Sequence, residues 1–121
     1  MAKIFLSYRF TVENPAELEG ILSNIKGSLK YAGHDVFCSF EQNQEYCLDR
    51  IESCQIFMPF IKSNEKNKGM KMESNKAMDY GKKYVLLIKE GLDHYEFRNL
   101  ADRVLEYKHL QELYASLKKF K

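Results

Sequence analysis

The sequence predicts an α/β protein in which helices cover both faces of a five-stranded parallel sheet. Short apolar segments rich in β-branched and aromatic residues alternate with segments whose apolar residues recur at the helical period. Because parallel strands are joined by right-handed crossovers, the natural strand order is 2-1-3-4-5, a flavodoxin-like three-layer sandwich. At 121 residues the chain is long enough for one core, so residues 1–121 are expected to form a single domain.

Five segments are predicted to be strands: 3–8, 35–40, 55–61, 83–88 and 103–107. The apolar density of the first suits a strand that is buried on both faces, and 83–88 has the clearest strand pattern. Pro59 lies within the third segment, and proline has no N–H to donate to a sheet.

A long helix is predicted between the first two strands. Asn14 is placed as its N-cap, Pro15 as its first helical residue and Gly33 as the left-handed residue that ends it. Gly20 and Gly27 each cost about 1 kcal/mol relative to alanine, so they are expected to mark close packing against the sheet. Further helices are expected around 48–54, from about 70 to 80 and over 110–120, with an irregular or helical stretch over 91–100.

Glu73 is the residue that most needs a chemical explanation. In a helix over 70–80 it shares a face with Met70, Ala77 and Met78. A carboxylate among core-facing apolar residues is costly unless it is hydrogen-bonded, paired or used in chemistry. The alternative is an acid in the first turn that complements the helix dipole.

The crevice between the carboxyl ends of the first and third strands is the expected ligand site, because open α/β sheets bind ligands there. The residues expected to line it are Tyr8, Arg9 and Phe10 on one side and Ser63, Asn64, Glu65 and the Glu73 helix on the other.

Four stretches resemble the nucleoside 2-deoxyribosyltransferase-like family and its N-glycosidase relatives: 4–10, 33–37, 69–73 and 82–88. The resemblance extends over nearly the whole chain. It implies that Glu73 is a nucleophile that attacks the anomeric carbon of a 2-deoxyribonucleoside, expels the base and holds the sugar covalently until a base or water takes it. A carboxylate suits this task, because it can form and release a glycosyl ester and stabilise an oxocarbenium-like transition state.

The resemblance also implies that Tyr8 hydrogen-bonds and orients the Glu73 carboxylate, which would keep it ionised. Phe10 and Phe40 are placed to sandwich a flat base, with core packing as the alternative for each. Ser63, with Asn64, follows the third strand where relatives contact the sugar or its phosphate, and an ordinary turn is the alternative. The full set of expected substrate-binding residues is Arg9, Phe10, Phe40, Ser63, Asn64, Gly69 and Met70.

The chain differs from the family pattern at three places. Ser74 and Asn75 stand where relatives commonly have an aliphatic residue and a glycine, which bears on how closely the helix packs on the sheet. Ser63 and Glu65 stand where relatives often carry an aspartate that binds the sugar hydroxyl. The segment 41–53, which in relatives helps to cover the base, is short. These differences leave base preference open and an inactive member as an alternative.

Lys62, Lys66, Lys68 and Lys71 surround the predicted start of the Glu73 helix, and a helix N-terminus favours anions. One hypothesis is therefore a substrate with a 5′-phosphate; the alternative is a solvated lysine-rich loop.

The leading functional prediction is an enzyme that cleaves or transfers the N-glycosidic bond of 2-deoxyribonucleosides or their 5′-monophosphates, without a cofactor or metal. The alternative is a TIR-like module that hydrolyses NAD or serves as a non-enzymatic interaction domain. A phosphorylation receiver is disfavoured, because the positions that would need acidic residues hold Tyr8, Arg9, Ile61 and Lys62. By its resemblance the enzyme should be a homo-oligomer, with the region 94–99 completing a neighbour's pocket or forming a plain surface helix.

Composition bears on partners and location. The formal net charge of +2 and the lack of an aromatic platform beside the lysines argue against nucleic-acid binding. No apolar run approaches the roughly 20 residues that cross a bilayer, and the N-terminus has no signal-peptide profile, so a cytoplasmic protein is expected. The three cysteines lack the spacing of a metal site or redox pair.

Overall fold

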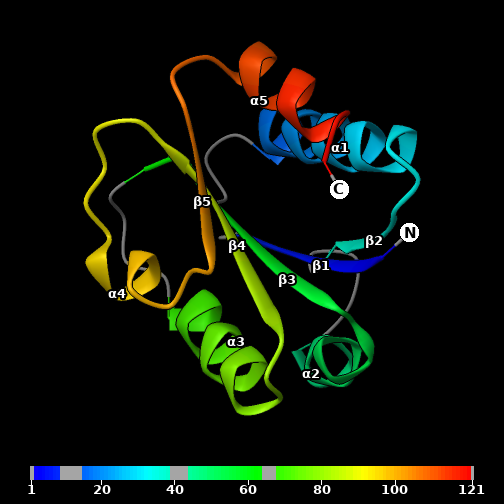
Figure 1. Ribbon diagram of the computed structural model, residues 1–121, viewed down its shortest axis with the longest axis vertical. Coiled ribbons are helices and arrows are strands. Elements are labelled where there is room, and N and C mark those ends of the chain that lie inside the picture. The colour runs from blue at the N-terminus through cyan, green and yellow to red at the C-terminus, as the bar shows by residue number, and fades with distance from the viewer. Residues whose placement is uncertain (1, 9–14, 39–43, 64–67, 121) are drawn as a thin grey trace.

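The computed structural model describes residues 2–8, 15–38, 44–63 and 68–120. Within them, a single parallel sheet of order β2-β1-β3-β4-β5 has helices on both faces (Figure 1), which confirms the predicted flavodoxin-like architecture. The strands are β1 (Lys3–Tyr8), β2 (Asp35–Cys38), β3 (Ile56–Ile61), β4 (Lys83–Lys89) and β5 (Arg103–Tyr107). The helices are α1 (Pro15–Tyr31), α2 (Gln44–Ser53), α3 (Lys68–Asp79), α4 (Tyr95–Arg98) and α5 (Leu110–Leu117).

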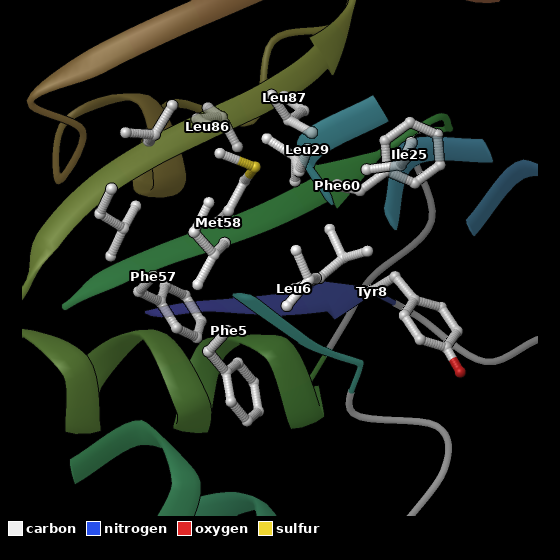
Figure 2. Close-up of a cluster of buried hydrophobic side chains, with 14 of the residues drawn as sticks. Phe5, Leu6, Tyr8, Ile25, Leu29, Phe57, Met58, Phe60, Leu86 and Leu87 are labelled. Atoms are coloured by element: carbon white, nitrogen blue, oxygen red, sulfur yellow. The ribbon is translucent and has the colours of Figure 1, made fainter. Parts of the chain in front are cut away.

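The two faces of the sheet carry different helices. Helices α1 and α5 cover one face and α2 and α3 the other (Figure 1). Because side chains alternate along a strand, neighbouring residues of β1 contribute to different layers. Phe5 and Phe57 lie on the α2 and α3 side and Phe60 on the α1 side (Figure 2). The ring centroids of Phe5 and Phe57 are 5.7 Å apart, and Phe60 stacks on Tyr107 at 5.9 Å.

Pro59 does not interrupt the sheet. It lies in β3 opposite Ser7 of β1, and the pairs of β3 with β4 on either side, Phe57 with Tyr84 and Phe60 with Leu87, keep one register. A central strand therefore contains a proline without a shift in pairing, so the carboxyl ends of β1, β3 and β4 remain aligned at one edge.

Glycines in the left-handed conformation end α1, as predicted, and also α3. Gly33 has a φ of 94° and Gly81 a φ of 68°. After α1, the N–H of His34 donates to the carbonyl of Leu29, and the N–H of Gly33 donates to that of Lys30. This pairing is the Schellman motif, and it turns the chain directly into β2.

The expectation that Gly20 and Gly27 pack closely on the sheet is wrong. Both lie on the exposed side of α1, and a Cβ built at either position would meet no atom within 4 Å. The two glycines therefore only weaken the helix, since glycine gives the unfolded backbone extra freedom.

We expect Gly27→Ala to stabilise the protein by about 0.5–1 kcal/mol, because alanine fits without contact and restricts the unfolded chain. Urea denaturation at neutral pH would measure this as a raised midpoint with an unchanged slope. A lowered midpoint would show that position 27 has a packing role.

Within the described residues, no helix has the length and apolar character needed to span a membrane.

Candidate active site

Glu73 is buried on the face of α3 that packs against the sheet, with only 4% of its surface exposed. It is the sixth residue of α3, and the first turn of that helix contains no acidic residue. Because the effect of the helix dipole falls off within the first turn, complementing the dipole does not explain this carboxylate.

The predicted inward stripe of α3 is confirmed for three of its four residues. Met70 and Ala77 are buried with Glu73, at 1% and 0% exposure. Met78 was also placed on this stripe, and that is wrong, since 42% of it is exposed. At 100° per residue Met78 lies about 80° around the helix from Met70, and it belongs to the last turn.

Ser7 makes the hydrogen bond that holds the Glu73 carboxyl group. Its Oγ donates to Glu73 Oε1 at 2.6 Å, and Ser7 itself has no exposed surface. The contact joins the middle of the sheet to α3 across 66 positions of sequence. Sequence reasoning did not single out Ser7, although a hydroxyl in the otherwise apolar run of β1 was a signal of a buried polar partner.

Burial raises the pKa of Glu73 from its ordinary value of 4.5 to about 7, although the hydrogen bond from Ser7 acts in the opposite direction. The carboxyl group is therefore balanced between its two protonation states near neutral pH, and it is not held fully ionised as the resemblance implied. A carboxyl group with this pKa at the ligand-binding edge of an α/β sheet is a candidate for chemistry.

Tyr8 follows Ser7 on β1, so its side chain leaves the opposite face of the sheet. It is 7% exposed and lies at the carboxyl end of β1, at the margin of the core cluster (Figure 2). The contact that the resemblance assigned to Tyr8 is thus made by its neighbour Ser7. A role for Tyr8 toward a substrate stays a prediction.

Ser74, one of the differences from the family pattern, packs α3 onto the sheet. It has no exposed surface, and its Oγ is 2.8 Å from the hydroxyl of Tyr84 on β4. Burial raises the pKa of Tyr84, so the phenol stays neutral in this contact. Two neighbouring residues of α3 therefore reach into the sheet by hydrogen bonds, Glu73 to β1 and Ser74 to β4.

Ser63 lies just after β3, as predicted, and its carbonyl accepts a hydrogen bond of 2.8 Å from Nε2 of His94. His94 precedes α4 and has a φ of 38°, in the left-handed region that side chains other than glycine rarely adopt. The region 94–99 was expected either to complete a neighbour's pocket or to form a plain surface helix, and its first residue, His94, contacts Ser63 of the same chain. Its contribution to an oligomer stays a prediction.

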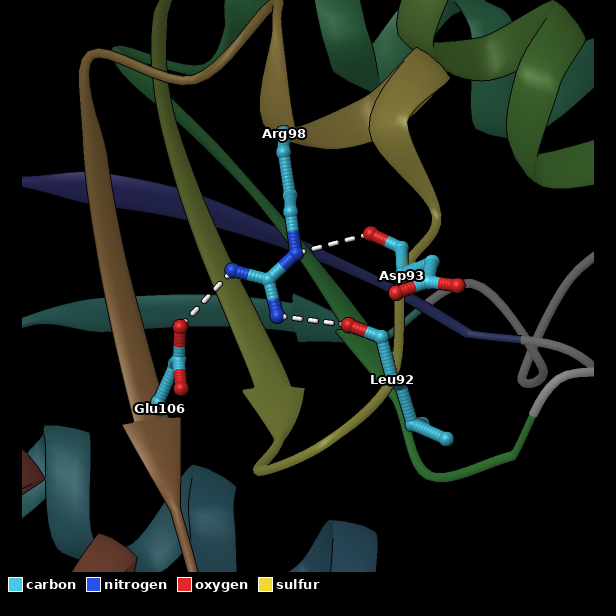
Figure 3. A network of polar contacts seen from close by, with 4 residues as sticks. All are labelled: Leu92, Asp93, Arg98 and Glu106. Atoms are coloured by element: carbon cyan, nitrogen blue, oxygen red, sulfur yellow. Dashed lines mark hydrogen bonds and ion pairs between the residues drawn. The ribbon is translucent and has the colours of Figure 1, made fainter.

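Arg98 fixes the turn that carries His94. Its guanidinium donates to the carbonyls of Leu92 and Asp93, each at 2.7 Å, and to the carboxylate of Glu106 on β5 at 2.8 Å (Figure 3). The position of His94 is thus tied to the edge strand of the sheet.

Two of the four lysines of the basic stretch have described side chains, and their surroundings differ. Lys71 is exposed, and its Nζ lies 3.6 Å from Oε2 of Glu96. Lys62 lines a cavity beside β3, β4 and β5. Lys66 lies outside the described residues, as does the side chain of Lys68.

Of the other predicted site residues, Arg9, Phe10, Phe40 and Asn64 lie outside the described residues. Gly69 is in the first turn of α3, and Met70 is buried in the core at the start of the Glu73 stripe. Their contacts with a substrate stay predictions. Among the described residues, no group of three or more histidine, cysteine or acidic side chains is arranged to hold a metal ion.

We expect Ser7→Ala to raise the pKa of Glu73 above 7, because the hydrogen bond that favours the carboxylate is lost. A pH titration of the carboxyl carbon of Glu73 by 13C NMR would measure the shift. Ser7→Thr keeps a hydroxyl and is the matched control. A pKa that does not change in Ser7→Ala would show that this bond leaves the carboxylate unaffected.

Comparison with solved structures gives matches over almost the full length of the chain. A CMP N-glycosidase of Clostridium botulinum has a TM-score of 0.74 and 19% identity, covering 98% of this chain and 99% of that one. A 2-deoxyribosyltransferase of Bacillus psychrosaccharolyticus has a TM-score of 0.72 and 19% identity, with 96% of each chain covered. A conserved protein of Enterococcus faecalis has a TM-score of 0.69 and 13% identity, with 98% of each chain covered.

These matches confirm the predicted resemblance at the level of the fold, which the chain shares with an N-glycosidase and a deoxyribosyltransferase. No family model matches the sequence, and the search of curated proteins found no match.

Proposed function

We propose that this protein is an enzyme that breaks the N-glycosidic bond of 2-deoxyribonucleosides or their 5′-monophosphates, passing the sugar through a covalent ester on Glu73 to water or to a second base. The observation that carries the proposal is the buried Glu73 carboxyl group on α3, hydrogen-bonded by Ser7 and with its pKa raised to about 7. The shared fold of an N-glycosidase and a deoxyribosyltransferase supports this choice of chemistry.

The arrangement suits a carboxylate nucleophile. Ser7 donates to Oε1, which leaves Oε2 to form the bond to the anomeric carbon. As that bond forms, the bond from the anomeric carbon to the base nitrogen breaks, and the base leaves with the electron pair and takes up a proton. Attack on the same carbon by water or by another base, which loses a proton in this step, then breaks the ester bond, releases the sugar and returns the carboxylate.

The raised pKa has two consequences for this reaction. A more basic carboxylate is the stronger nucleophile, but only its ionised fraction can attack. The rate constant kcat/KM should therefore rise with pH and level off above about pH 7, where Glu73 is ionised.

Base release from a substrate panel tests the proposal. The panel holds the common 2-deoxyribonucleosides, their 5′-monophosphates, the matching ribonucleosides and NAD, each assayed by chromatography with and without a second free base as acceptor. Release from the deoxynucleosides or deoxynucleotides supports the proposal. Release from NAD alone favours a TIR-like activity, and a folded protein that releases no base from any of them contradicts an enzymatic role.

The monophosphates also decide whether the substrate carries a phosphate. A kcat/KM for a deoxynucleoside monophosphate that is no higher than for its deoxynucleoside would contradict the phosphate hypothesis. In the described part of the basic stretch, Lys71 is already near Glu96, so a phosphate there would compete with that carboxylate.

A further inference from the structure

A cavity of about 380 Å³ opens on the face of the sheet opposite Glu73, and we propose that it binds the phosphate group of a small anionic molecule. It lies where β3, β4 and β5 end, between the start of α1 and the start of α5. This site is separate from the one assigned to the proposed function, because α1 and α5 cover this face and α3 covers the other (Figure 1).

Three lysines stand at or just past the carboxyl ends of three neighbouring strands. Lys62 follows the last residue of β3, Lys89 is the last residue of β4 and Lys108 follows the last residue of β5. All three line the cavity. Ile61 pairs with Ile88, so continuing the register by one residue places Lys62 beside Lys89. On β5 the partner of Lys89 is Tyr107, so Lys108 lies one residue beyond the position opposite Lys89. Adjacent strands are about 4.8 Å apart, and like charges directly opposite each other destabilise a sheet.

In the described part of the cavity, the three lysines carry more charge than the acidic lining can balance. Among the described residues, no ion pair is formed by the ammonium groups of Lys62, Lys89 or Lys108. Glu17, on an exposed part of α1, is the acidic residue among the described lining residues, so the three lysines exceed the acids there by two charges. An anion held between the strands would offset their repulsion.

The start of α5 adds hydrogen-bond donors beside the lysines. Its N-cap residue, His109, lines the cavity and makes no side-chain capping hydrogen bond, and Leu110 lines it too. The first N–H groups of a helix favour an anion. The stacked rings of Phe60 and Tyr107 form an apolar wall, which suits a phosphate carried on a small organic molecule.

Binding of inorganic phosphate and of adenosine 5′-monophosphate, followed by 1H–15N NMR at constant ionic strength, tests the proposal. Adenosine and added chloride are the uncharged and non-specific controls. We expect saturable shifts of the amides of residues 89 and 108–110 with either phosphate compound. The double variant Lys89→Gln/Lys108→Gln should weaken binding by at least about tenfold, since two positive charges that can hydrogen-bond the phosphate are removed. Lys30→Gln, on the exposed surface of α1, should leave binding unchanged.

The same titration with Glu73→Gln separates this proposal from the proposed function, because phosphate should bind that variant as it binds the wild type. No saturable shift with either phosphate compound, or binding that the double variant retains at full strength, would overturn the proposal. Shifts with adenosine equal to those with its monophosphate would overturn it as well, because the phosphate would then contribute nothing.

Discussion

Replacing Glu73 by glutamine is expected to abolish base release, with a fall in kcat of about 10³-fold or more, as found when a covalent nucleophile is removed. Glutamine keeps the size of the side chain and an oxygen that can accept the hydrogen bond from Ser7. It lacks the negative charge that attacks the anomeric carbon and stabilises the oxocarbenium-like transition state. The fall should therefore reflect chemistry, and the fold should be unchanged.

Chromatography of released base, with whichever panel substrate the wild type cleaves best, measures this effect. Glu19→Gln is the matched control, because Glu19 is an exposed glutamate of α1. It should keep the wild-type rate. A Glu73→Gln variant that releases base within about tenfold of the wild-type rate would show that another group performs the chemistry.

The same Glu73→Gln substitution is expected to stabilise the protein at neutral and alkaline pH. Burial raises the pKa of Glu73 from 4.5 to about 7, so the folded state binds more protons than the unfolded state between these values. The stability due to the protonated group is complete below about pH 4.5 and is lost as the pH rises through 7. A shift of this size corresponds to about 3 kcal/mol. Glutamine resembles the protonated acid at every pH and avoids the loss.

Urea denaturation of both proteins between pH 4.5 and 8.5 checks this prediction. The free energies of unfolding should agree near pH 4.5, and the variant should exceed the wild type by up to about 3 kcal/mol above pH 7. Subtracting the free energy of unfolding of the wild type from that of the variant at each pH cancels the contribution of groups that titrate equally in both proteins. The control Glu19→Gln should give no pH-dependent difference from the wild type. A difference that is constant with pH, or a variant less stable at pH 8, would show that the carboxylate is well accommodated in the fold.

The expected loss of base release and the expected gain in stability of Glu73→Gln together describe a residue that lowers the stability of the fold but is needed for catalysis. A buried carboxyl group with one described hydrogen bond is a poor element of a core. Stabilising substitutions at functional sites usually reduce activity, because the site needs a group that the fold alone would not choose. A gain in stability together with a loss of activity in Glu73→Gln would place Glu73 in this class.

The sheet order was predictable from the sequence because its evidence is local and repeated. Apolar segments recur between amphipathic ones, and Gly33 and Gly81 stand where the left-handed caps are. The burial of Glu73 was likewise predictable from its spacing relative to Met70 and Ala77. In contrast, Met78 has the right spacing for the stripe but lies at its edge, where the helix ends and solvent begins.

The partner of Glu73 depends on which face of β1 meets α3, and a sequence pattern does not give this directly. The resemblance selected Tyr8, but the alternation of side chains along β1 brings Ser7 to the α3 side. The contact between Ser63 and His94 was similarly beyond prediction, because it joins two loops 31 positions apart. The prediction for Gly20 and Gly27 was wrong for another reason. A glycine in a helix marks close packing only when another element lies close to it, and none lies within 4 Å of a Cβ built at either position.

Trapping the glycosyl ester tests the central claim most directly. A 2′-deoxy-2′-fluoro-arabinonucleoside of the preferred base serves as the probe, because fluorine beside the anomeric carbon destabilises the oxocarbenium-like transition state and slows release of the sugar. Intact-protein mass spectrometry followed by peptide mapping should find one fluorinated sugar per chain, attached to Glu73, and none in Glu73→Gln. A sugar attached to another residue, or the same labelling of Glu73→Gln, would contradict the assignment of Glu73 as the nucleophile.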